Sequence, residues 1–139
     1  MKKTILLFLL PVGLVFMFTR CTDDEPLPGL GSPFTIDYGE KVQLTDGLSI
    51  RFEEVTTDSR CPCEAECITA GQIGVKLKIT TNDTELLKLF TLAGYDDLEG
   101  AVTKTRFDGY LIELKDVLPY PCNGQPDKPE DYKVEVLVK

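Results

Sequence analysis

Apolar and polar residues alternate along most of the chain after residue 33, with the period of two that turns one face of a β-strand toward a core. The alternation predicts seven strands, at residues 41–45, 48–55, 75–79, 84–92, 102–107, 110–115 and 133–139. Asp46-Gly47, Asn82-Asp83 and Asp108-Gly109 provide turn residues between successive strands. A break in phase before Val55 indicates a β-bulge near Glu53 and Glu54.

Residues 84–92 are apolar on both faces, which is typical of a central strand or of a short helix. We favour the strand because the segment follows a turn of hairpin length. No other segment has a convincing helical period. The pattern therefore predicts an all-β fold, an antiparallel β-sandwich of about seven strands and immunoglobulin-like in size, in residues 34–139, with a small β-barrel as the alternative.

The first 20 residues have the pattern of a secretory signal peptide. Lys2 and Lys3 precede an uncharged apolar run of 14 residues, 5–18, whereas a bilayer span needs about 20. Residues 21–33 are acidic and then rich in Pro and Gly, a composition typical of a flexible tether rather than of a packed segment.

A signal that ends at a single cysteine, Cys21, and continues into a tether resembles the bacterial lipoproteins. The resemblance implies cleavage before Cys21 and attachment of lipid, including palmitate, to that residue. The acidic run Asp23-Asp24-Glu25 is similar to the signal with which Bacteroidetes lipoproteins reach the cell surface. The resemblance thus implies an outer-membrane lipoprotein, on the cell surface or on the periplasmic face.

Composition narrows the possible functions. A formal charge of −8 disfavours nucleic-acid binding, which requires a basic surface. The chain has no histidine, so Ser–His and Cys–His catalysis and metal sites with histidine ligands are excluded within it. We expect no cofactor, no bound metal and no catalytic residue.

Four cysteines remain after Cys21: Cys61, Cys63, Cys67 and Cys122. An even number in a small exported domain predicts disulfides, in preference to a four-thiolate zinc site or a redox site. A bridge from Cys61 to Cys63 would close too tight a ring. Two pairings stay open, in which either Cys61 or Cys63 is joined to Cys122.

A second resemblance rests on the Asp58-Ser59-Arg60-Cys61-Pro62 motif, on Cys67, on Ala70-Gly71 and on residues 118–121, Leu-Pro-Tyr-Pro. These motifs are similar to those of a family of small, largely uncharacterised exported Bacteroidetes proteins. The family shares Cys61 and Cys67, whereas Cys63 and Cys122 are additions in this chain. The resemblance implies the bridges Cys61–Cys67 and Cys63–Cys122.

Either pairing ties residues 58–72 to the loop at 119–131. We therefore expect a stiff binding surface at one end of the sandwich, which contains Arg60, Glu64, Glu66, Tyr120 and Asn123. Tyr120 is the candidate anchor residue, with the alternative role of plugging the end of the sandwich. Arg60 and Asp58 have the alternative role of pairing with each other.

We expect the domain to be monomeric and non-enzymatic. Three functions are considered, the first as the preferred one and the other two as alternatives. The first is a non-catalytic module, anchored in the membrane by lipid, that binds or scaffolds a protein or glycan. The second is a protease inhibitor presenting a disulfide-braced loop. The third is a small hydrolase using carboxylates, whose candidates are the acidic clusters at 53–54, 96–99 and 127–131.

Overall fold

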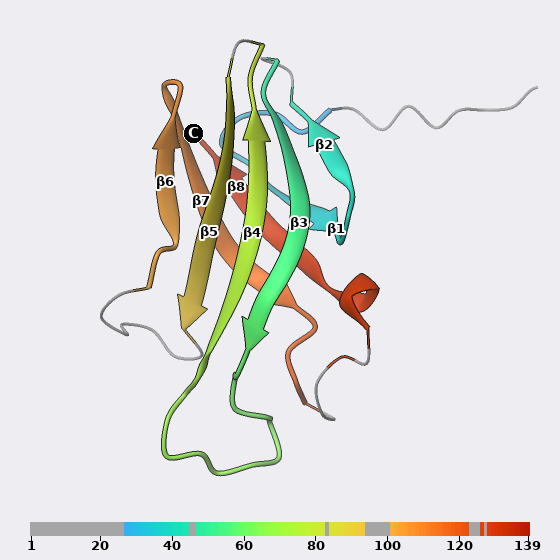
Figure 1. Ribbon diagram of the computed structural model, residues 1–139, viewed down its shortest axis with the longest axis vertical. Coiled ribbons are helices and arrows are strands. Elements are labelled where there is room, and N and C mark those ends of the chain that lie inside the picture. Colours follow the sequence, from blue (N-terminus) through green and yellow to red (C-terminus); the bar gives the residue numbers. More distant parts are fainter. Residues whose placement is uncertain (1–26, 45–46, 83, 94–100, 123–125, 127) are drawn as a thin grey trace, which may run out of the picture.

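The computed structural model describes residues 27–44, 47–82, 84–93, 101–122, 126 and 128–139, and these residues form two four-stranded antiparallel sheets (Figure 1). The first sheet has the order β1-β8-β7-β6, and its strands are β1 (Pro33–Asp37), β8 (Lys133–Val138), β7 (Tyr110–Leu118) and β6 (Lys104–Phe107). The second has the order β2-β3-β4-β5, with β2 (Lys41–Gln43), β3 (Ser49–Asp58), β4 (Gln72–Thr80) and β5 (Glu85–Ala93). A 3-10 turn, η1 (Pro129–Asp131), precedes β8. The sheets are not closed into a barrel, so the predicted β-sandwich is confirmed.

The alternation read from the sequence determines which side chains enter the core. Ile50 and Phe52 of β3 are opposite Ile79 and Leu77 of β4, and all four are fully buried. The intervening Arg51 is exposed. The register shifts between Phe52 and Glu54 and again after Val55, which confirms the predicted bulge.

Strand β5 agrees with the strand predicted over residues 84–92. Its position in the second sheet is at the edge, beyond β4. Phe90 is buried in the core, whereas Leu87 and Leu89 on the opposite face are 58% and 47% exposed. The segment is apolar on both faces because of these two exposed leucines and not because the strand is central.

Strand β1 is missing from the sequence prediction, which places Pro33 in the tether and finds about seven strands, whereas the described residues form eight. Phe34 and Ile36 alternate with polar residues and face the core, but the strand is short and lies at a sheet edge. It pairs with β8 from Pro33↔Leu137 to Asp37↔Lys133. The backbone joins the sandwich slightly earlier, since the Gly31 N–H donates to the Val138 carbonyl at 2.7 Å.

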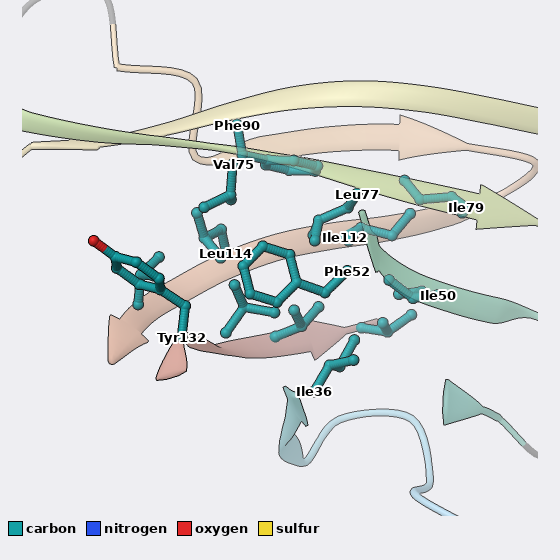
Figure 2. Packing of buried hydrophobic residues seen from close by; sticks show 14 of the residues in the cluster. Ile36, Ile50, Phe52, Val75, Leu77, Ile79, Phe90, Ile112, Leu114 and Tyr132 are labelled. Carbon is teal, nitrogen blue, oxygen red and sulfur yellow. The ribbon is translucent and has the colours of Figure 1, made fainter. Parts of the chain in front are cut away.

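Apolar side chains from the two sheets meet in one core (Figure 2). Phe52 lies near its centre, between Leu77 of the second sheet and Leu114 of the first. Tyr132 enters the same cluster at one end, and its hydroxyl points away from the apolar side chains (Figure 2). This orientation lets the phenol bond polar groups outside the core.

Strand direction places the loops at two opposite ends. Strands β3 and β7 run toward the end that also contains the start of β8, so residues 59–71, 119–122 and 128–132 lie together there. We call this the braced end; its loop between β3 and β4 is at the bottom of Figure 1, and η1 lies above that loop at the right. Gly31 is bonded at the other end of β8, so the chain enters the sandwich opposite the braced end.

Candidate binding site at the disulfide-braced end

Two disulfides hold the braced end together, Cys61–Cys67 and Cys63–Cys122. They are the pairs that the family resemblance implies. The first closes a small ring within the loop between β3 and β4. The second links that loop to the segment after β7, across 59 residues of sequence. The two sheets are thus joined covalently at this end.

Arg60 lies beneath the loop and not on its surface. It is 2% exposed, so its expected role as a surface binding residue is wrong. Its Nε and Nη2 atoms donate to the two carboxylate oxygens of Asp58, at 2.9 and 2.8 Å. Nη1 and Nη2 also donate to the carbonyls of Val117 and Pro119, at 2.6 and 2.9 Å. The alternative of an Asp58–Arg60 pair with a structural role is therefore the one that the structure contains.

Asp58 has a second partner residue, Tyr132, which directly precedes β8 of the first sheet. The Tyr132 hydroxyl donates to Asp58 Oδ2 at 3.0 Å. Burial raises the pKa of the Asp58 carboxyl, but the hydrogen bonds and positive charge of Arg60 outweigh this effect and hold that pKa below its usual value. Burial, together with the hydrogen bond to Asp58, raises the pKa of the Tyr132 phenol to about 12.

Tyr120 covers this buried network. The guanidinium carbon of Arg60 lies 5.0 Å from the centroid of the Tyr120 ring, within the range of a cation–π interaction. Tyr120 itself is only partly exposed. Its ring therefore closes the end of the sandwich over Arg60, which is the plugging role considered for it.

The Ala70-Gly71 pair lies at the base of the loop between β3 and β4, against Ser59 and Cys61. Gly71 has φ +68°, and a Cβ there would overlap the carbonyl oxygen of Ser59. The Cys61 N–H donates to the Ala70 carbonyl at 3.1 Å, and the Ser59 N–H donates to the Gln72 carbonyl at 2.8 Å. The loop is consequently closed at its base by hydrogen bonds as well as by the disulfide.

The outer part of this loop, residues 63–69, is exposed. Glu64 and Glu66, two of the predicted binding residues, are exposed. Ile68 is also exposed, with a relative accessibility of 104%. Sequence reasoning missed Ile68, although an aliphatic residue directly after a half-cystine in a polar loop was a visible signal. Asn123 lies outside the described residues.

The remaining candidate chemistry is dispersed. Glu54 and Glu85 each pair with a lysine across the outer face of the second sheet, Lys76 at 2.7 Å and Lys78 at 2.9 Å. They line an open depression of about 500 Å³. The acidic residues at 96–99 and Asp127 lie outside the described residues.

No group of three or more potential metal ligands occurs in the described part of the chain. Among the same residues, no helix is long and apolar enough to cross a membrane.

Comparison with protein-family models, with curated proteins and with solved structures finds no match for the chain.

Proposed function

We propose that this chain is an exported lipoprotein whose β-sandwich is a non-catalytic recognition module on the cell surface. Cys21 is the acylated residue in this proposal and residues 22–30 form the tether; Cys21 lies outside the described residues. The partner is a protein or a glycan, and the braced end is the surface that meets it.

The placement of the braced end is the observation that carries the proposal. The chain enters the sandwich at Gly31, beside the end of β8, whereas the exposed loop lies beyond the start of β8. A domain held through its N-terminal segment would therefore direct this loop away from the membrane. Its acidic charge also opposes contact with anionic lipid head groups.

Rigidity supports recognition as the role of this loop. Two disulfides, the buried Asp58–Arg60 pair and the Gly71 contact hold one loop in one shape. A loop that is already ordered loses less conformational entropy on binding than a flexible one. Among the residues that provide this rigidity, Arg60 and Cys61 are buried, while the side chains of Glu64, Glu66 and Ile68 are exposed.

Antibody binding to intact cells tests the display. Cells that produce the full chain should bind an antibody raised against the folded sandwich, and extracted protein should partition into the detergent phase. Cys21→Ala should abolish both, whereas Thr22→Ala, the matched control, should change neither. Detergent partition of the Cys21→Ala variant equal to that of the wild type would refute acylation at Cys21. Antibody access to the wild type only after permeabilisation would refute surface display.

A further inference from the structure

Ile68 is the most accessible of the large hydrophobic residues that the structure describes. The other exposed ones lie between 38% and 58% exposed, against 104% for Ile68. Single apolar side chains on a surface are common and need no explanation by themselves. Ile68 differs because the chain on both sides of it is fastened to the sandwich.

On its N-terminal side, Ile68 follows Cys67, whose bridge leads to the nearly buried Cys61. On its C-terminal side, the Ala70 carbonyl accepts a hydrogen bond from the Cys61 N–H, and Gly71 packs against Ser59. The residues flanking Ile68 are thus attached to the same short stretch of backbone. This attachment presents one exposed aliphatic side chain on a loop whose two sides are held together.

The charged residues nearest to Ile68 in the sequence are both acidic. Residues 61–75 contain Glu64 and Glu66 but no lysine or arginine, and the whole chain has a formal charge of −8. A partner with a cationic surface around its binding pocket is electrostatically favoured, and its association should be faster at low ionic strength.

We propose that residues 67–69 bind in the active-site cleft of a cationic serine protease of the elastase type, with Ile68 in its specificity pocket. This inference rests on the proposed role of the domain as a recognition module. The pocket of such proteases is small and apolar, and fits a branched aliphatic side chain. Trypsin instead carries an aspartate in this pocket and chymotrypsin a deep hydrophobic slot, so both should bind the wild-type loop less well.

The attachment on both sides of Ile68 explains why the loop would inhibit the protease rather than be consumed by it. Attack of the protease serine on the Ile68 carbonyl carbon breaks the bond to Thr69, and the protease histidine passes the serine proton to the Thr69 amine. Because Ala70 and Gly71 remain held beside Cys61, this amine stays close to the acyl-enzyme. It can attack the ester, return the proton through the histidine and restore the peptide bond before water enters.

Enzyme inhibition by the full chain, purified in detergent with both bridges intact, tests the proposal. Pancreatic elastase, chymotrypsin and trypsin are assayed with small chromogenic peptides at low and high salt. The wild type should inhibit elastase most strongly, with a dissociation constant of about 10⁻⁸ M or lower, as in other protease–inhibitor pairs. Ile68→Val should retain this inhibition. Ile68→Lys should weaken elastase inhibition about 100-fold and create inhibition of trypsin.

Leu87→Lys is the matched control, because Leu87 is exposed on β5 and the variant makes the same change of charge. It should inhibit elastase as the wild type does. Absence of elastase inhibition by the folded wild type, rapid hydrolysis after Ile68, or failure of Ile68→Lys to inhibit trypsin would overturn the proposal. Any of these results, combined with antibody binding to intact cells, would refute the protease partner and leave surface display in place.

Discussion

Arg60 provides a hydrogen-bonded connection between the two sheets at the braced end. Its guanidinium donates to Asp58 at the end of β3, to the carbonyl of Val117 in β7 and to the carbonyl of Pro119 just after β7. Ion pairs of this kind cost desolvation when they form, so their net contribution to stability can be small. Removal of one member is different, because it leaves an uncompensated charge or unsatisfied carbonyls in the interior.

Arg60→Ala should therefore lower the free energy of unfolding by about 3–5 kcal/mol, measured by guanidinium denaturation. Arg51→Ala is the control. Arg51 pairs with Glu53 at 3.5 Å with half of its side chain exposed, so its loss should cost less than about 1 kcal/mol. Equal effects of the two substitutions would show that the Arg60 network does not stabilise the fold.

The ionisation of Asp58 predicts a loss of stability in acid. The pKa of Asp58 is lowered in the folded protein, so the folded state favours the ionised carboxylate. The resulting stabilisation is present above the ordinary aspartate pKa of about 3.9 and is lost as pH falls through the lower pKa of the folded state. Protonation weakens the pair with Arg60.

Wild type and Asp58→Asn should thus differ most in unfolding free energy above about pH 5, and the difference should shrink below about pH 4. Chemical denaturation across this pH range provides the measurement. A difference that stays constant down to about pH 2 would assign the effect of the substitution to packing instead of charge.

At the scale of the elements, the loop between β3 and β4 depends on Gly71 at its last turn. Gly71 and Gly109 both have positive φ, at +68° and +85°, but a Cβ meets the Ser59 backbone at the first and nothing within 4 Å at the second. Alanine substitutions at the two positions therefore distinguish the cost of backbone strain alone from the cost of strain combined with steric overlap.

Gly109→Ala should cost about 1–2 kcal/mol, the strain of an L-residue in the left-handed region. Gly71→Ala should cost more than about 4 kcal/mol, because the strand junction must also move apart. Thermal and chemical unfolding of both variants measures the contrast. Similar losses of unfolding free energy in the two variants would mean that the loop between β3 and β4 relaxes around the methyl group added at Gly71.

The two disulfides should contribute unequally to stability. Cys63–Cys122 spans 59 residues and Cys61–Cys67 spans 6, and loop-closure entropy increases with the length of the closed loop. Replacing both cysteines of the long bridge with serine should lower the free energy of unfolding by about 4 kcal/mol. The same replacement in the short bridge should lower it by about 2 kcal/mol. Unfolding of the two double variants under non-reducing conditions checks the order, and the reverse order would contradict the entropic account.

At the scale of the whole molecule, the fold was predictable where its cause is local. Period-two alternation belongs to each segment by itself, so the strands containing Ile50, Val75 and Val134 follow from the sequence. The pairing of β1 with β8 is non-local, and its short alternating segment resembles the tether that precedes it. The eighth strand was missed for this reason.

The candidate site was likewise predictable where its contacts are local in sequence and not where they are distant. Asp58 and Arg60 are two residues apart, so their pairing was a reasonable alternative from sequence. The burial of Arg60 depends on acceptors 57 and 59 residues away, which no local pattern indicates. The accessibility of Ile68 likewise results from how the bridges shape the loop.

The chain enters the sandwich at Gly31 at one end, and a braced acidic loop lies at the other. The anchor at Cys21 is the central claim, because it decides where the domain is and which way the loop points. Mass spectrometry of the N-terminal peptide from membrane-extracted protein tests it most directly. Acylation at Cys21 predicts a peptide that begins at Cys21 and carries a diacylglycerol thioether and an amide-linked acyl chain. A peptide in which Arg20 still precedes an unmodified Cys21 would contradict it.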